Sequence, residues 1–235
     1  MTVRAQTEPE LEPSLLRPPA LGVRALQVVY APGALFDRLR DRPLWGAALL
    51  LGAAAVVLSF LLVPAEVWEA SFREQVLSSG RDLPEGFSFS GLARVFGTVA
   101  AGVFWFVWAF LLAGVLAFVF AFVLGDEARY AQYLSVVSHA LLIAAAGALL
   151  TVPLKVAQGD PQLTLNLGAF AVGLDEGSYA ARVLRLLDLF MLWSYAVMAV
   201  GISRLEPRRS WQSAAAFLLV VAVGLALAFA LFTPA

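Results

Sequence analysis

The chain has 235 residues, of which 61% are hydrophobic and only 14% are charged, whereas soluble domains contain about 45–50% apolar and about 25% charged residues. The net charge of −1 gives no electrostatic reason to expect a nucleic acid partner. The absence of cysteine excludes disulfides and thiolate metal sites, and the single histidine, His139, excludes a multi-histidine metal site within one chain. The composition therefore predicts an integral membrane protein without a metal or other cofactor.

The N-terminal region divides into a tail and a short helix. Residues 1–27 are rich in proline, glutamate and arginine, lack the apolar core of a signal peptide, and are expected to form a flexible cytoplasmic tail. After Pro32, apolar residues recur with a helical period and charged residues cover the opposite face as far as Pro43. This pattern is typical of a short helix in the membrane interface, and an extension of the first span is an equal alternative.

Five apolar segments are long enough to cross the hydrocarbon core of a bilayer, which takes roughly 20 residues of helix. They comprise residues 43–65, 95–125, 130–154, 184–203 and 210–233. The second is longer than a crossing requires, so it is expected to tilt or project. We therefore predict an all-α membrane protein, with a membrane domain over residues 28–235. In this domain a short interfacial helix precedes a five-transmembrane-helix bundle.

The basic residues predict the orientation of this bundle. Five crossings place the N-terminal region and the loops at 126–129 and 204–209 on one side, together with ten of the 16 basic residues. Short basic flanks are cytoplasmic, so we expect the N-terminus inside and the C-terminus outside the cell. Lys155 is the only lysine beside fifteen arginines, a bias typical of a GC-rich, bacterial genome. The predicted location is the cell inner membrane.

Two longer loops, at about residues 66–94 and 155–183, are expected on the outer side. The first is hydrophilic and contains apolar residues at helical spacing. The second is nearly as apolar as a span, but glycines interrupt it, and Leu163, Leu165 and Leu167 alternate as in an extended segment. We expect this second loop to dip into the interface or to pack over the bundle.

Asp188 is the first candidate for a functional residue, because an ionisable side chain inside a membrane segment is costly. It would serve as a proton or cation site, or as the partner of Arg185 one helical turn before it. The structural alternative is that Asp188 lies at the outer interface, where an aspartate in the first turn of a helix interacts favourably with the helix dipole. This alternative is the favoured one, since the residue lies only a turn inside the boundary.

Ser135, Ser138 and His139 form a second polar group, within about one turn of the third span. Histidine titrates near neutral pH and binds metals. A lone histidine without an HExxH pair makes a metal site a poor interpretation, so we expect no metal. Hydrogen bonding between membrane helices is the favoured role over a proton relay.

Motifs of common enzyme classes are missing from the sequence. It contains no GxSxG, GxxxxGK[ST] or GxGxxG, and the spans hold no nucleophile–base pair or pair of carboxylates. We therefore predict no catalytic residues and a protein that is not an enzyme.

Three stretches together resemble the Yip1 domain family of integral membrane proteins. They are APGALFDRLRDRPLW at 31–45, YAQYLSVVSHALL at 130–142 and LLDLFMLWSYAVMAVGIS at 186–203. The resemblance covers about residues 28–232 and implies a five-helix domain with a cytosolic N-terminus. Eukaryotic members are associated with early secretory traffic and Rab GTPases, a role that does not transfer to a bacterial cell. The family supplies no catalytic residues.

Two functional hypotheses follow. The first is a membrane scaffold or adaptor, whose partners are the lipid bilayer and another membrane protein or a second copy of the chain. The alternative is a small transporter, channel or lipid-handling protein with a polar site between spans three and four, formed by Asp188, His139, Ser135, Ser138 and Arg185.

Overall fold

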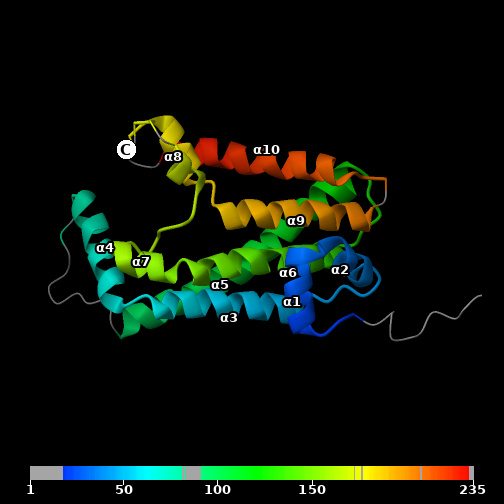
Figure 1. Ribbon diagram of the computed structural model, residues 1–235, viewed down its shortest axis with the longest axis horizontal. Coiled ribbons are helices and arrows are strands. Elements are labelled where there is room, and N and C mark those ends of the chain that lie inside the picture. The colour runs from blue at the N-terminus through cyan, green and yellow to red at the C-terminus, as the bar shows by residue number, and fades with distance from the viewer. Residues whose placement is uncertain are drawn as a thin grey trace, which may run out of the picture.

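In the computed structural model, the described residues are 18–80, 82, 91–171, 173–175, 177–206 and 208–232. The helices are α1 (Leu21–Tyr30), α2 (Pro32–Leu39), α3 (Gly46–Leu62), α4 (Ala65–Ser78), α5 (Leu92–Leu116), the π-helix η2 (Ala117–Val123), α6 (Tyr130–Leu150), α7 (Val152–Gln158), the 3₁₀ turn η3 (Leu167–Phe170), α8 (Tyr179–Arg185), α9 (Leu189–Leu205) and α10 (Trp211–Ala230). The helices α3, α5, α6, α9 and α10 run along the long axis, and the shorter helices lie across the bundle or at its ends (Figure 1). The all-α prediction is confirmed.

The helix α6 forms the centre of the bundle. Every residue from 133 to 143 is buried, and α6 packs against α1, α3, α5 and α9. Small residues allow the closest approaches: Gly147 of α6 lies against the ring of Phe190, and Gly201 of α9 lies against Val136. Any side chain at these glycines would collide with the opposite helix. Close packing at small residues is a usual source of stability between helices in a bilayer, where lipid is as apolar as the helix surface.

Helix length determines how many crossings the structure supports. In the described part of the chain, three helical stretches are long and apolar enough to cross a membrane: Leu92–Val123, Tyr130–Gln158 and Trp211–Ala230. A fourth crossing results if α3 and α4, which meet at a bend of 83°, are counted as one. The 17 residues of α9 extend ~26 Å at ~1.5 Å per residue, less than the ~30 Å of the hydrocarbon core. The predicted membrane character is confirmed, and the predicted five spans are not.

The segment predicted as the fourth span, residues 184–203, is interrupted. The helix α8 ends at Arg185 and α9 begins only at Leu189, with Asp188 in an extended conformation (φ −70°, ψ 133°) as its N-cap. An aspartate stabilises a helix start better than a helix interior, because its carboxylate accepts from otherwise unpaired backbone N–H groups. The break at 186–188 therefore shortens the fourth predicted span at its N-terminal end.

The N-terminal helices differ from the predicted tail. The tail predicted for residues 1–27 overlaps α1, which begins at Leu21, while residues 1–17 lie outside the described chain. The helix α1 buries Arg24 and Val28 against the bundle and exposes Leu26 and Tyr30. An arginine on the buried face hides the amphipathic pattern of this helix in the sequence. The short helix expected after Pro32 is present as α2.

One end of the bundle is held together by an ion pair between two turns. Asp126, just before α6, accepts two hydrogen bonds from Arg209, just before α10, at 2.9 Å to Nε and 2.5 Å to Nη2. The guanidinium also lies over the ring of Phe120, 5.0 Å from its centroid. The hydrogen bonds to Asp126 raise the pKa of Arg209. These contacts place the α9–α10 turn beside the end of η2 and the start of α6.

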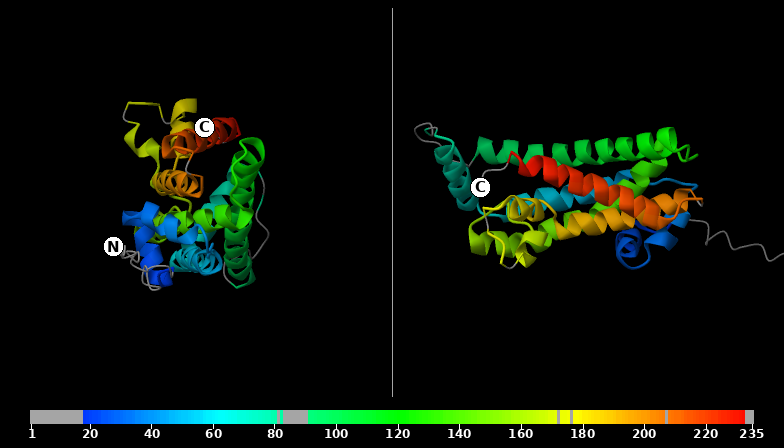
Figure 2. Two further views of the ribbon diagram at one scale, coloured as in Figure 1. Left: turned by 90° about the vertical axis from the view of Figure 1, so that its right-hand side faces the viewer. Right: turned by 90° about the horizontal axis from the view of Figure 1, so that it is seen from above.

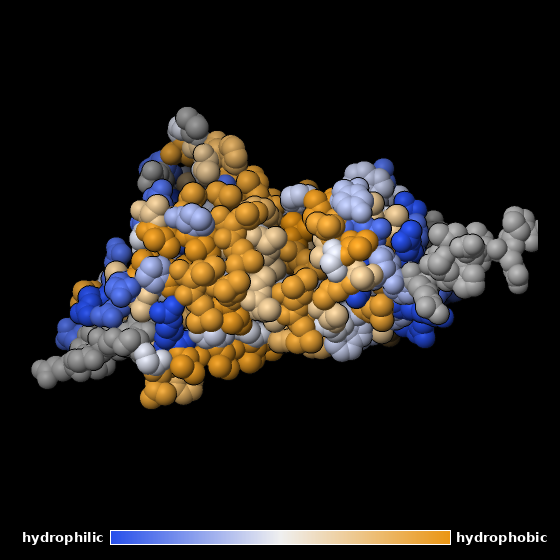
Figure 3. Space-filling model, turned by 60° about the horizontal axis from the view of Figure 1, so that its bottom comes forward, coloured by the Kyte–Doolittle hydropathy of each residue, from blue (hydrophilic) through white to orange (hydrophobic). Residues whose placement is uncertain are grey.

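The surface has the character of a membrane protein. A belt of hydrophobic side chains covers the middle of the face in Figure 3, and hydrophilic residues gather at both ends. Figure 2 shows α5 on one side of the bundle and the α1–α2 pair on the opposite side. The outward side chains of α5 and α10 are apolar and well exposed, as expected for helices that face lipid.

Candidate functional site

The break between α8 and α9 is positioned by the loop that connects α7 to α8. Leu167 donates its backbone N–H to the carbonyl of Leu187 at 3.0 Å, and Leu189 donates to the carbonyl of Leu165 at 2.8 Å. This short antiparallel pairing lies on both sides of Asp188 and holds it in place. The predicted alternation in the loop thus corresponds to an extended segment that packs against the start of α9.

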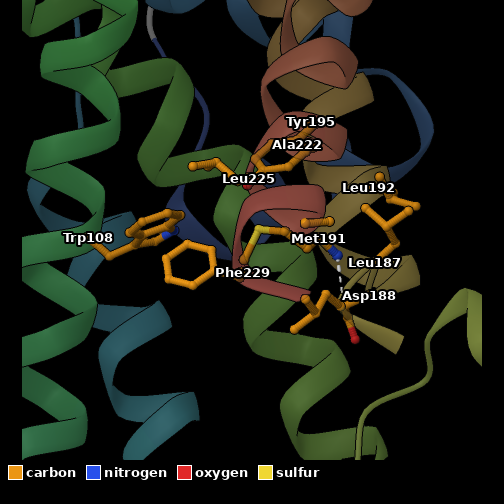
Figure 4. Close-up of a pocket in the computed structure, with 11 residues that line it drawn as sticks. Trp108, Leu187, Asp188, Met191, Leu192, Tyr195, Ala222, Leu225 and Phe229 are labelled. Carbon is orange, nitrogen blue, oxygen red and sulfur yellow. Dashed lines mark hydrogen bonds between the residues drawn. The ribbon is translucent and has the colours of Figure 1, made fainter. Parts of the chain in front are cut away.

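Asp188 performs a local structural role at this position. Its Oδ1 accepts a hydrogen bond from the backbone N–H of Met191 at 2.8 Å, shown as a dashed line in Figure 4. The carboxylate therefore satisfies one of the N–H groups that a helix start leaves unpaired. Among the described residues, no ion pair joins it to Arg185. The aliphatic part of the Arg185 side chain packs near Gly168.

Asp188 also lines two neighbouring cavities, which we call together the side cavity. The larger, of about 440 Å³, lies between α3, α5, α6, α7 and the start of α9. The smaller, of about 190 Å³, lies between α5, α9 and α10. The two share walls formed by Trp108, Leu186, Asp188 and Met191. Figure 4 shows the smaller one, with Trp108 and Phe229 facing Met191 above Asp188.

The larger part of the side cavity is chemically asymmetric. Its polar lining is formed by Asp188 and by residues at or after the end of α6: Thr151, Lys155 and Thr164. The charges of Lys155 and Asp188 lie close enough to interact, although no direct ion pair forms between them in the described structure. The remaining walls are aromatic and aliphatic. The cavity therefore combines an opposite pair of charges with an apolar interior.

The second polar group is closed and fully satisfied. His139 is completely buried, and its Nδ1 lies 2.8 Å from the carbonyl of Ser135 while its Nε2 lies 3.0 Å from Nη1 of Arg24. A carbonyl only accepts and a guanidinium only donates, so Nδ1 carries the proton and Nε2 is the acceptor. His139 is therefore a neutral imidazole with both nitrogens in use. Neither nitrogen remains for a metal, and no metal-binding cluster occurs among the described residues.

Arg24 brings three parts of the chain together. Besides His139, its Nη1 approaches the carbonyl of Leu44, at 3.5 Å, in the turn before α3. The hydroxyl of Ser135 donates to the same carbonyl at 3.3 Å. Burial lowers the pKa of Arg24, yet a guanidinium keeps its proton at physiological pH. A cation thus lies between α1, α6 and the turn before α3, with Nε lacking an acceptor among the described residues.

The structure separates the candidate residues into two groups. Gly147, which touches Phe190 at the start of α9, follows His139 by eight residues, or ~12 Å along the helix axis. Neither part of the side cavity is lined by Ser135, Ser138 or His139. The group at His139 is a junction between helices, and the group at Asp188 is the one that borders open space.

Comparison with known proteins agrees with the membrane character of the chain. A family model described as the Yip1 domain matches residues 26–232. The chain belongs to the Yip1 domain family. The membrane protein YknW of Bacillus subtilis (strain 168) is 22% identical over 210 residues, which cover 88% of this chain and 87% of that protein. No solved structure is significantly similar to the chain. The predicted family is therefore confirmed.

The Yip1 match begins inside α1, so His139 and Asp188 lie within it and Arg24 lies just before it. Arg24 and Lys155 are the important residues that the sequence interpretation missed. Lys155 had one usable signal, since it is the only lysine and follows an apolar span directly. The sequence signal for Arg24 was weaker: the apolar residues at 21, 25 and 28 recur with helical spacing around it and indicate a helix.

Proposed function

We propose that this Yip1-family protein is a non-enzymatic scaffold or adaptor in the cell inner membrane, which acts through contacts with another membrane protein or with a second copy of itself. The supporting observation is the closed centre of the bundle. Ser135, Ser138 and His139 bond to α6 itself, to Arg24 and to the turn before α3. Polar groups that are hydrogen-bonded between helices stabilise one arrangement of the bundle. They do not form a continuous polar path along which an ion or a lipid headgroup could cross the membrane.

The proposed topology has five crossings, with the N-terminus in the cytoplasm. The chain traverses the long axis in alternating directions through α3, α5, α6, α9 and α10 (Figure 1). At the outer end Tyr179 of α8 donates to the carbonyl of Leu227, near the end of α10, at 2.6 Å. In this arrangement α9 completes a crossing although it is short, because α8 and the extended loop segment pack at its outer end. The basic residues then favour the end with Asp126 and Arg209 as cytoplasmic.

The helix α4 is the proposed contact element. It contains no buried residue, and it turns away from α3 at the edge of the molecule (Figure 1). A direct test places a photo-crosslinking amino acid at Glu74 on α4 and, as a control, at the exposed position Val220 on α10. A discrete protein adduct from position 74 and none from position 220 is the expected result in living cells. The adaptor proposal fails if crosslinkers along α4 give only lipid adducts.

The lipid-handling alternative has its own observation, the side cavity at Asp188. Flux and lipid-scrambling assays in reconstituted liposomes separate it from the adaptor. The adaptor proposal expects no ion flux and no scrambling above that of empty liposomes. Transport that is lost in Asp188→Asn but kept in the exposed control Asp37→Asn would favour the alternative.

A further inference from the structure

The side cavity contains two opposite charges that do not touch each other. Lys155 and Asp188 both line its larger part, and neither takes part in a direct ion pair with a described residue. Both side chains are half-buried, and Asp160 also lies near Lys155 without a direct ion pair. A charge that is partly removed from water is costly unless an opposite charge or several hydrogen bonds compensate it. A ligand that carries both charges, a short distance apart, would satisfy both residues at once.

The cavity opens toward the hydrocarbon of the bilayer. Phe104, Leu225 and Phe229 line it and are also exposed, by 66%, 44% and 60% of their surface. Exposed apolar side chains of this size in a membrane bundle face lipid. An occupant can therefore enter sideways from the membrane and place its polar part between Lys155 and Asp188.

We propose that the side cavity binds one zwitterionic phospholipid with a primary ammonium group, of the phosphatidylethanolamine type. Lys155 contacts the phosphate and Asp188 accepts hydrogen bonds from the ammonium. The acyl chains run along Met191 and Phe229 toward the bilayer.

Two details favour this headgroup. The carboxylate of Asp188 is a hydrogen-bond acceptor with about four lone-pair sites, and the backbone N–H groups of Met191 and Phe190 occupy only part of this capacity. A primary ammonium donates hydrogen bonds to such a group, whereas a quaternary ammonium has no N–H to donate and binds aromatic faces instead. The indole Nε1 of Trp108, which lines both parts of the cavity, is buried without an acceptor among the described residues. It is suited to donate to an ester carbonyl of the lipid.

This inference deepens the lipid-handling alternative and does not depend on the adaptor proposal, since a bound lipid is compatible with either function. Binding and scrambling are measured separately. A protein that binds the lipid without moving it supports the inference and leaves the adaptor in place.

The test is native mass spectrometry of the detergent-purified full chain with added dioleoyl lipids that differ only in headgroup: ethanolamine, choline and glycerol. We expect the ethanolamine lipid to bind about tenfold more tightly than the choline lipid, because a charge-assisted hydrogen bond is lost. Asp188→Asn, which retains the ability to cap α9, should abolish this preference. Lys155→Gln should weaken binding of all three lipids about tenfold.

Matched controls are Asp37→Asn and Arg73→Gln, which make similar chemical changes at exposed positions outside the cavity. Both should bind like the wild type. Ala148→Leu, which narrows the larger part of the cavity, should reduce binding without changing any charge. Equal affinity for the three lipids in the wild type overturns the proposal. So does an unchanged lipid preference in a folded Asp188→Asn protein.

Discussion

The guanidinium of Arg24 donates from Nη1 to Nε2 of His139 across 3.0 Å, although 115 residues separate them in the chain. The pair fastens α1 to the buried middle of α6. It contains no carboxylate, so the contact links a cation to a neutral ring. Its role is to hold α1 against the bundle, and it predicts how stability responds when either partner is removed.

Arg24→Met should destabilise the protein by about 1–3 kcal/mol, because Nε2 of His139 loses its donor in a buried site. Resistance to unfolding in mixed detergent measures this change. The double variant Arg24→Met with His139→Leu should lie closer to the wild type, since removing both polar partners leaves no unsatisfied group. Arg38→Met, at an exposed position on α2, is the control. If Arg24→Met is as stable as the control Arg38→Met, the structural role of the Arg24–His139 pair is contradicted.

The Asp126–Arg209 pair gives a second prediction, for the end of the bundle that holds the α9–α10 turn. The two side chains expose only 4% and 18% of their surface. Arg209→Gln leaves the carboxylate of Asp126 buried without its partner and should cost about 3 kcal/mol. Arg42→Gln, at an exposed position before α3, should cost less than about 0.5 kcal/mol, as is usual for surface substitutions. Thermal unfolding of both variants in the same detergent makes the comparison, and similar losses would contradict the assignment.

The membrane character and the long helices could be predicted from the sequence because uninterrupted apolar length is a local property. The ends of the helices could not be predicted as well. The break before Leu189 depends on backbone hydrogen bonds with Leu165, which accepts, and Leu167, which donates, both more than twenty residues before Leu189 in the chain. Apolar composition alone continues smoothly across that break, so residues 184–203 read as one span.

The sequence predicted which residues are candidates for a site, but it did not predict which of them lie together in the structure. Asp188 and His139 stand out because ionisable residues are rare in apolar helices. Their separation depends on which turn of α6 faces α9, and that follows from the small residues Gly147 and Gly201. The role of Arg24 was not predicted because its partner, His139, is distant in the sequence and because α1 was interpreted as part of the N-terminal tail.

The third prediction concerns the packing of α6 on α9 at Gly147. A methyl group there would collide with the ring of Phe190. Gly147→Ala should therefore destabilise the bundle by about 1–3 kcal/mol, the usual cost of overpacking. Gly114→Ala in α5 is the matched control, because nothing lies within 4 Å of the added carbon. That substitution should be neutral or stabilising by up to about 1 kcal/mol through higher helix propensity. A Gly147→Ala protein as stable as Gly114→Ala would show that α6 and α9 are not in this contact.

The proposed five-crossing topology leads to a fourth prediction, which the lack of cysteine in the chain makes simple to test. Single cysteines at Arg73, Gln162 and Arg208, all exposed positions, report on the first outer loop, the second outer loop and the α9–α10 turn. A membrane-impermeant maleimide added to intact cells should label positions 73 and 162 at once, and position 208 only after permeabilisation. The comparison of 162 with 208 isolates α9, because these two positions flank it. If α9 does not cross the membrane, positions 162 and 208 will be labelled together, and the 17-residue helix must then be assigned to one side of the bilayer.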